Sequence, residues 1–246
     1  VPSGSGGTYH IYCQVVQHNL ARHIPGNPTM IIKNRPGAGG LVSASYMANV
    51  AKKDGTEIAM IAPGTLTLPL MRKVKFDGQK FNFLGSVAAR SAAIWVWHTK
   101  GVTKLDDLKT KKVKLASSSY SSAGSVIPRM VNKILGTQIE VIYGYKGGGA
   151  MNIAIERGES DGRWNYPSGF ASVRPKWIPD KMMIPVLATG PRDPVLKGVP
   201  HMHDLLKEGT VERKMYDVFD LNFQVGQAFY APPGTNPEAL KILRTA

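Results

Sequence analysis

The sequence is organised around the stretch Ser117-Ser118-Ser119-Tyr120-Ser121-Ser122-Ala123-Gly124-Ser125. It follows a short apolar run, residues 113–116, and precedes a helical pattern, residues 126–135. We therefore expect a strand-to-helix turn that directs free main-chain N–H groups and the positive end of a helix dipole at one place. One such turn most often serves as a helix cap. A second one, Ser3-Gly4-Ser5-Gly6-Gly7-Thr8, opens the sequence, and the pair indicates a binding cleft with one wall from each turn.

Strands and helices alternate around these turns in two successive series. In the first series the pattern predicts helices at residues 8–23, 41–52 and 66–71 and strands at 29–33, 57–62 and 81–87. In the second it predicts strands at residues 113–117, 140–145, 161–165 and 181–188, and helices at 126–135, 150–157 and 211–219. Such alternation is typical of a parallel sheet with right-handed crossovers.

Two further strands, residues 92–98 and 223–230, are expected to cross between the series. This predicts an α/β protein of two lobes, residues 1–98 with 226–246 and residues 99–225, each a mostly parallel sheet flanked by helices. Ligands of open parallel sheets bind beyond the carboxyl ends of the strands, where the Ser/Gly turns lie. We therefore expect a clamshell that closes about the two crossing strands as a hinge.

Composition and charge narrow the function classes. Hydrophobic residues make up 43% of the 246 positions, as in a globular protein. The formal net charge of +14 would suit nucleic acid, an anionic membrane or small anions. The basic residues are spread along the chain without a nucleic-acid-binding motif, so we expect no nucleic-acid partner. Because Cys13 is the single cysteine and His201 and His203 lack an acidic cluster nearby, we expect no metal and no cofactor.

The two ends of the sequence also carry expectations. Only Val1 and Pro2 precede the first turn, although a turn of this kind needs a strand before it. The last predicted helix begins at Pro237, after Asn236 as its N-cap, and stops at Ala246. We therefore expect a trimmed sequence from which a signal peptide has been removed.

Four motifs resemble those of the substrate-binding proteins of the tripartite tricarboxylate transporter family, also called the Bug family of periplasmic receptors. Residues 34–40 match the family's NRPGAGG almost letter for letter, and residues 5–8 match its first Pro-Gly-Gly turn with Ser5 in place of the proline. Residues 145–147 match its YKG turn and residues 231–235 its APAGT. The resemblance covers nearly the whole chain in the right order. It implies a type II periplasmic binding-protein clamshell, located in the periplasm, that binds small organic anions and delivers them to a membrane permease.

The resemblance also implies a set of ligand-binding residues by position. The first-lobe candidates are Ser3, Gly7, Thr8 and Thr65, and the second-lobe candidates are Ser118, Ser119, Ser121, Ser122, Gly147, Gly148 and Asn165.

Other candidates lie beside these positions. Tyr9 and Tyr120 adjoin the turns and could stack on a ligand ring or pack in the core. Arg163 could grip a carboxylate with two bonds, but strand alternation puts it opposite Trp164, so that only one of the two faces the cleft. His10 stands where the family often has an aspartate able to hold an ammonium group. We therefore expect a plain di-, tri- or aromatic carboxylate as ligand rather than an amino acid.

Three functions compete on these observations. The first is a monomeric periplasmic receptor that captures a carboxylate without chemistry. The second is an enzyme that acts on a small anionic substrate on a similar two-lobe scaffold. We expect neither a nucleophile elbow nor paired carboxylates at the turns, which offer hydroxyls and N–H groups but few titratable groups, so we assign no catalytic residue. The third, a nucleic-acid binder, would need a continuous positive face.

Overall fold

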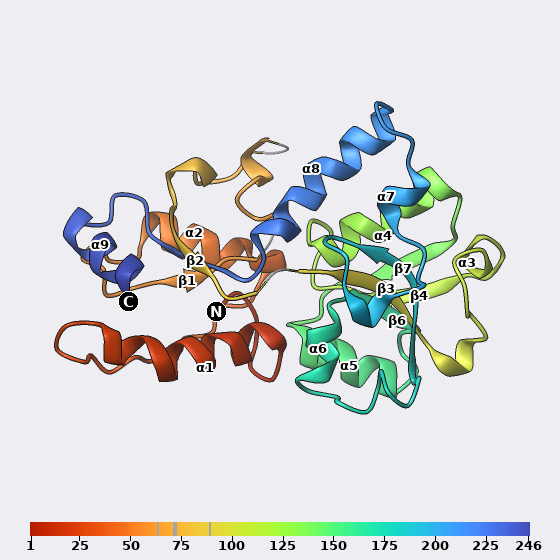
Figure 1. Cartoon of the computed structure of the whole chain (residues 1–246), viewed down its shortest axis with the longest axis horizontal. Coiled ribbons are helices and arrows are strands. Elements are labelled where there is room, and N and C mark those ends of the chain that lie inside the picture. Colours follow the sequence, from red (N-terminus) through yellow and green to blue (C-terminus); the bar gives the residue numbers. More distant parts are fainter. Residues whose placement is uncertain (63, 71–72, 89) are drawn as a thin grey trace. The chain divides into compact units, whose positions relative to one another are not determined.

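The structure is a computed structural model that describes residues 1–62, 64–70, 73–88 and 90–246. The chain divides into two compact units. The first consists of Val1–Ala88 and Gly226–Ala246, and the second lies between these two pieces and ends at Val225. Each unit has a sheet of its own (Figure 1). The lobes expected from the sequence, residues 1–98 with 226–246 and residues 99–225, remain a prediction.

The sheet of the first unit is antiparallel. Its strands are β1 (Ala59–Met60), β8 (Ala228–Ala231) and β2 (Asn82–Ser86), in the order β1-β8-β2. Because β8 runs between β1 and β2 in the opposite direction to both, neither of its neighbours has a parallel partner in the described sheet. The expectation of a mostly parallel sheet is therefore wrong for these strands. The strand expected to cross back between the lobes is the central strand of this sheet.

The strand predicted at residues 29–33 does not form a ladder in the described structure. Val1 alone pairs with this segment: its ammonium group donates to Lys33 O at 2.9 Å, and Arg35 N–H donates to Val1 O at 2.8 Å. These two bonds have the arrangement of a parallel pair of strands, one rung long. A strand is stabilised by a continuous series of main-chain hydrogen bonds to a neighbouring strand. Residues 29–33 have only the pairing with Val1, so they do not form the predicted strand.

Three α-helices cover the first sheet. They are α1 (Thr8–Leu20), α2 (Leu41–Asn49) and α9 (Pro237–Thr245). In Figure 1, α1 lies below the strands and α2 above them. The Asn236 side chain caps α9 by accepting bonds from Glu238 N and Ala239 N, as the sequence predicted. Short 3₁₀ turns lie at Ala21–His23, Ala38–Gly40, Leu68–Leu70 and Gly78–Lys80.

Part of one prediction lies outside the described residues. The helix expected over residues 66–71 includes Met71, which is not described, and its described part contains only the 3₁₀ turn Leu68–Leu70. Pro63 of the preceding turn is likewise outside the description.

The second unit contains a mixed five-stranded sheet in the order β5-β4-β6-β3-β7. Its strands are β5 (Ile139–Ile142), β4 (Val113–Ala116), β6 (Gly162–Asn165), β3 (Ala92–Trp97) and β7 (Met183–Thr189). β4 pairs in parallel with β5 and β6, as predicted, whereas β3 is antiparallel to β6 and β7. The prediction that β3 crosses between the lobes is wrong. Residues 92–96 have no exposed surface, and such a strand stays inside a sheet covered on both faces.

Helices lie on both faces of this sheet. They are α3 (Asp107–Thr110), α4 (Ala123–Leu135), α5 (Gly148–Glu156), α6 (Pro167–Ala171), α7 (Met202–Leu205) and α8 (Val211–Val225). In Figure 1, α5 and α6 lie below the sheet and α4 and α8 above it. α8 continues to Val225, past its predicted end, because Tyr216, Asp220 and Phe223 form one buried helical face. Among the helices in the described part of the chain, none has the length and apolar character of a membrane span.

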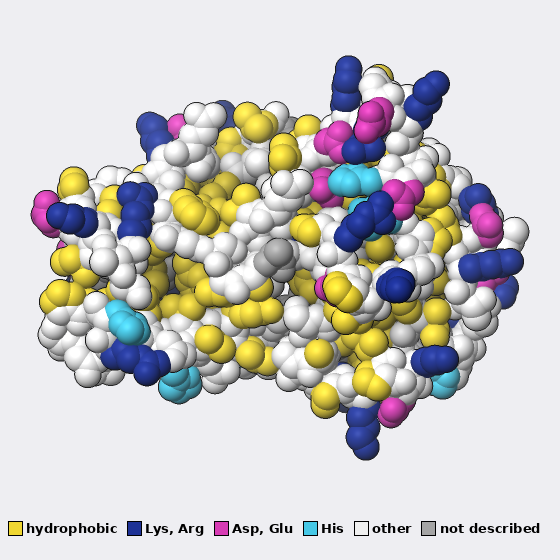
Figure 2. Space-filling view, viewed as in Figure 1, with side chains coloured by type: hydrophobic (Ala, Val, Ile, Leu, Met, Phe, Trp, Pro, Cys, Tyr) yellow, Lys and Arg dark blue, Asp and Glu magenta, His cyan; other side chains and the backbone are white. Residues whose placement is uncertain are grey.

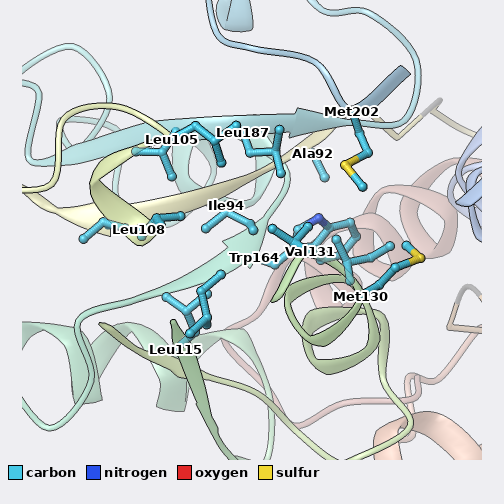
Figure 3. Close-up of a cluster of buried hydrophobic side chains, with 14 of the residues drawn as sticks. Ala92, Ile94, Leu105, Leu108, Leu115, Met130, Val131, Trp164, Leu187 and Met202 are labelled. Atoms are coloured by element: carbon cyan, nitrogen blue, oxygen red, sulfur yellow. The ribbon is translucent and has the colours of Figure 1, made fainter. Parts of the chain in front are cut away.

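The larger core fills the space between the second sheet and α4. Ile94, Leu115 and Trp164 point from the strands toward Met130 and Val131 of α4, and all five are buried (Figure 3). The opposite face buries Trp95 against Phe170 and Trp177. All four tryptophans of the chain, at positions 95, 97, 164 and 177, belong to this unit.

Candidate functional site

The serine-rich turn leads from the end of β4 into α4, as predicted. Ser122 is the N-cap residue of α4 in an extended conformation, but its side chain makes no capping bond. Its hydroxyl instead donates to Ser119 O at 2.9 Å and lies 2.8 Å from Ser117 Oγ. Ser119 Oγ is buried and has no hydrogen-bond partner among the described residues. The hydroxyls therefore shape the turn and leave the first N–H groups of α4 available to an anion.

The remaining positions of this turn differ in their surroundings. Ser118 and Ser121 lie within the turn and are half-buried. Tyr120 is 65% exposed, and the Arg129 guanidinium lies over its ring at 3.6 Å. Arg129 also donates to Tyr120 O at 2.9 Å. The tyrosine is thus held on the outside of the turn by a cation–π contact.

Arg163 organises the end of β6. Its Nη1 donates to Gly148 O at 2.9 Å and to Asn152 Oδ1 at 3.1 Å, and its Nη2 donates to Asn165 Oδ1 at 3.0 Å. A Cβ atom on Gly148 would lie 3.0 Å from Nη1, so a glycine at this position lets the guanidinium approach α5. Trp164, on the opposite face of the strand, packs in the core and donates to Thr189 Oγ1 at 3.0 Å. The predicted alternation between Arg163 and Trp164 is therefore confirmed.

Asn152 and Asn165, which we call the amide pair, are the least satisfied polar side chains of this region. Both are buried, with 1% and 2% of their surface exposed. Because Arg163 binds both side-chain oxygens, both amino groups point away from it. Neither Asn152 Nδ2 nor Asn165 Nδ2 has a hydrogen-bond acceptor among the described residues. An unpaired buried amide costs about 1–3 kcal/mol, so the pair is suited to an acceptor from outside the protein.

The turn that precedes α5 adds a second helix N-terminus to the amide pair. Gly147 is the N-cap residue of α5, and no side chain caps the helix. Asn152 lies on this helix and was not predicted as a site residue. The signal available in the sequence was an asparagine inside an otherwise apolar helical stretch, Met151-Asn152-Ile153-Ala154-Ile155, where a polar side chain needs a reason.

In the first unit, Asn34 links two of the predicted turns. Its amide donates to Ser3 O at 2.8 Å and lies 3.2 Å from His10 Nδ1. Gly7 is the N-cap residue of α1 without a side-chain cap, so Thr8 is the first helical residue. Ser3, His10 and Gly7 are therefore brought together at the N-terminus of α1.

The NRPGAGG turn packs against the third turn of the first unit. Gly40 has a φ of 101°, and a Cβ atom there would lie 2.9 Å from the Ala62 side chain and 3.4 Å from Thr65 Oγ1. Thr65 is buried, with 3% of its surface exposed. Gly40 thus allows close packing between the two turns. Tyr9 packs with the cluster of Cys13, Met60 and Phe229, which supports a core role.

One serine pattern in the sequence matches the nucleophile motif of esterases but lies between elements of the wrong type. Residues 158–162, Gly-Glu-Ser-Asp-Gly, fit G-x-S-x-G, the sequence pattern of a nucleophile elbow, which was not expected in this chain. The segment joins the end of α5 to β6, and Ser160 is 1% exposed, with its hydroxyl donating to Gly162 O at 2.8 Å. A nucleophile elbow instead joins a strand to a helix and exposes its serine. The pattern therefore does not build a nucleophile here.

The histidines of the described residues form no metal site, and the charged side chains on the face seen in Figure 2 are of both signs. His201 Nε2 bonds to Gly190 O at 2.9 Å, and no group of three or more His, Cys, Asp or Glu among the described residues is placed to hold a metal. Figure 2 shows Lys and Arg side chains scattered over this face, with Asp and Glu among them near α8. The face in view thus lacks the continuous basic surface that nucleic-acid binding needs.

Comparison with known proteins assigns the family. Residues 12–246 match the model of the tripartite tricarboxylate transporter family receptor. A UPF0065 protein from the gbd 5′ region of Cupriavidus necator is 29% identical over 124 residues, which are 50% of this chain and 37% of that protein. A UPF0065 protein of Bordetella bronchiseptica is 26% identical over 146 residues, which are 56% of this chain and 43% of that protein. The chain thus spans about two fifths of the length of these relatives.

Solved structures show the same fold. MatC from Rhodopseudomonas palustris, with bound malate, superimposes with a TM-score of 0.78 at 19% identity over 99% of this chain and 80% of its own. The periplasmic binding protein BugD gives a TM-score of 0.78 at 20% identity over 98% and 78%. Rpa4515 of R. palustris, with adipate, gives 0.73 at 21% identity over 99% and 78%. The fold is therefore that of the periplasmic binding proteins, and by its family match the chain belongs to the receptors of the tripartite tricarboxylate transporter family.

Proposed function

We propose that this protein is a periplasmic solute receptor that captures a small organic carboxylate and delivers it to a membrane permease. The observation that carries the proposal is the amide pair of the second unit. Two buried amino groups, on Asn152 and Asn165, have no acceptor among the described residues, and the oxygens of the same side chains accept from Arg163. A carboxylate only accepts hydrogen bonds, so it complements such a set of donors.

The energetics favour an ionised ligand over a neutral one. A hydrogen bond to a charged group contributes about 1.5–3 kcal/mol, and the same bond relieves the cost of a buried donor without a partner. The positive ends of α4 and α5 act in the same direction, since anions are stabilised at helix N-termini. We propose that Ser119 and the first N–H groups of both helices contribute to the same anion. We propose separately that Ser3, Gly7 and Thr65 of the first unit serve ligand binding.

The proposed ligand is a dicarboxylate or another plain carboxylic acid. The structural neighbours that contain malate and adipate support this class. His10 Nδ1 lies beside the amide of Asn34, and it offers no negative charge to an ammonium group. Capture without conversion is proposed because the receptor family is a binding family and the turns present donors rather than an acid–base pair. Action as a monomer and delivery to the permease are proposed from the family.

The amide pair can be tested by substitutions that preserve shape. Asn152→Asp and Asn165→Asp each replace an NH₂ group with a carboxylate oxygen next to Arg163. We expect the affinity for malate or adipate, measured by calorimetry, to fall at least tenfold, which corresponds to about 1.4 kcal/mol. The thermal midpoint should stay the same or rise, because the new carboxylate can pair with Arg163.

Asn19→Asp is the matched control. Asn19 is exposed on α1 and also contacts an arginine, Arg22, but it lies outside the proposed site. It should leave the affinity unchanged. Undiminished binding in both variants of the amide pair would contradict the proposal, as would turnover of the bound acid or tight binding of glutamate.

A further inference from the structure

The amide of Asn34 has only one orientation that satisfies both of its neighbours. Asn34 lies in the turn at residues 34–40, and His10 lies in the first turn of α1. Asn34 Nδ2 is 2.8 Å from Ser3 O and 3.2 Å from His10 Nδ1. A main-chain carbonyl only accepts hydrogen bonds, so the NH₂ group of Asn34, and not its oxygen, must face Ser3. The opposite orientation would place two acceptor oxygens against each other.

This orientation of the amide decides which ring nitrogen of His10 carries the proton. An NH₂ group only donates, so His10 Nδ1 must accept from Asn34. A neutral imidazole carries one proton, and with Nδ1 as the acceptor that proton lies on Nε2. No described residue accepts a hydrogen bond from Nε2, which lies on the ring edge away from Asn34. Neutral His10 therefore presents an N–H donor that the described residues leave unused.

Both side chains are carried by segments that are held in place. The main-chain N–H of His10 donates to Gly7 O at 2.9 Å in the first turn of α1. Next to Asn34, the guanidinium of Arg35 lies over the ring of Tyr46 at 3.5 Å, which ties the turn to α2. A donor that is already oriented loses little conformational freedom when a ligand binds, so more of the hydrogen bond appears as affinity.

We propose that His10 determines specificity in this receptor and that Asn34 is its positioning residue. Neutral His10 donates Nε2–H to an acceptor oxygen of the ligand, a carboxylate or carbonyl oxygen, and Asn34 keeps the proton on that nitrogen. A group that only donates, such as an ammonium, finds no lone pair on His10, because Asn34 already occupies Nδ1. The inference rests on the proposed function, since it names the kind of group on the captured acid that His10 recognises.

The position of the proton is measurable in the ligand-free protein. A two-bond ¹H–¹⁵N correlation spectrum of protein with labelled histidine distinguishes the protonated ring nitrogen from the bare one. The spectrum is recorded in mildly alkaline buffer, in which an imidazole is neutral, and His10→Gln identifies the signals of His10 by their loss. We expect the proton on Nε2. Malate should shift the resonances of Nε2 and leave those of Nδ1 nearly unchanged.

Two substitutions test whether Asn34 sets the tautomer. In Asn34→Asp the new carboxylate only accepts, so the proton should move to Nδ1. In Asn34→Ala no partner remains, so both tautomers should appear; this variant also serves if the aspartate prevents folding. A proton on Nδ1 in the unmodified protein would overturn the proposal. A proton that stays on Nε2 in the folded variants would overturn the role of Asn34.

Calorimetry with malate and adipate tests the contact with the ligand. His10→Leu removes the donor, and the affinity for the acid that the unmodified protein binds should fall about tenfold or more. His10→Gln returns an N–H group at the end of the side chain and should recover most of that loss. His18→Leu is the matched control, because His18 is exposed on the same helix and contacts only Gln14 O.

The outcomes separate this inference from the proposed function. Undiminished affinity in His10→Leu, or a His10→Gln variant that binds as weakly as His10→Leu, would overturn the role of His10 while the unmodified protein still binds its acid. If the unmodified protein bound no carboxylate, the proposed function would fail, and the ligand contact of His10 with it.

Discussion

At the scale of single residues, Gly169 decides where the amide of Asn165 can lie. A Cβ atom on Gly169 would stand 2.7 Å from Asn165 Oδ1 and 2.8 Å from Nδ2, closer than van der Waals contact allows. Arg163 holds the same amide from the other side at 3.0 Å. The orientation of the Asn165 amide thus depends on Gly169, which leaves room for it, and on the guanidinium of Arg163, which donates to its oxygen.

Gly169→Ala adds only one methyl group, but we expect it to disturb the site strongly. We expect the substitution to push the Asn165 amide away from Arg163, to lower stability by about 1–3 kcal/mol through overpacking, and to weaken carboxylate binding. The measurements are a urea titration and calorimetry. Gly85→Ala is the control, because nothing lies within 4 Å of the added atom there and the backbone conformation is ordinary. If both variants bind alike, Gly169 does not position the site.

At the scale of elements, the contacts between His201 and its neighbours join β7, α7 and α8. His201 is 4% exposed, its Nε2 bonds to Gly190 O at 2.9 Å, and its Nδ1 accepts from His203 N at 3.2 Å. Gly190 N in turn donates to Tyr216 Oη and Asp220 Oδ1 of α8, both at 3.1 Å. Burial lowers the pKa of His201, so protonation of the imidazole is disfavoured in the folded state.

This arrangement predicts a loss of stability in mild acid. A histidine in the unfolded chain takes up a proton near pH 6.5, whereas folded His201 takes it up only at lower pH. The unfolded state therefore binds more protons below about pH 6.5, and the free energy of unfolding should fall there by up to ~1.4 kcal/mol per pH unit. Urea titrations between pH 7.5 and pH 5 would measure the fall. His201→Gln should flatten the slope; an unchanged slope in this variant would refute the assignment.

The elements also show what the sequence could and could not predict. The turn at residues 117–122 was predictable, because Gly and Ser between an apolar run and a helical pattern mark a strand-to-helix turn directly. The places of β3 and β8 were not, because periodicity reveals a strand but not its neighbours or its direction. Asn152 was missed for a related reason: its role depends on Arg163, which only the parallel pairing of β4 with β6 brings near α5.

At the scale of the whole molecule, the two units are built differently. The second is one continuous piece of chain with its own core, whereas the first is assembled from two pieces that are far apart in the sequence. β8 and α9 come from the later piece and complete the sheet and helices of the first unit. Residues in contact within the second unit are thus closer in sequence than the residues that join the two pieces of the first unit.

We expect residues 90–225 to fold when expressed alone. They should give a cooperative thermal transition and the near-ultraviolet circular dichroism of ordered tryptophans, because both faces of the second sheet are covered within the piece. Residues 1–88 alone should not fold cooperatively, since they lack the central strand β8. A molten second unit, with secondary structure but no near-ultraviolet signal, would refute the independence of its core.

The placement of the indole rings has an optical consequence. Because every tryptophan belongs to the second unit, intrinsic emission excited at the red edge of absorption reports on that half of the molecule alone. Trp95 donates through its ring nitrogen to Asn165 O at 2.9 Å. This hydrogen bond connects a fluorescent side chain directly to the strand end that carries Asn165 of the amide pair. In a titration, the wavelength of tryptophan emission would therefore respond to a solute bound at that strand end. It would not respond to changes confined to the first unit.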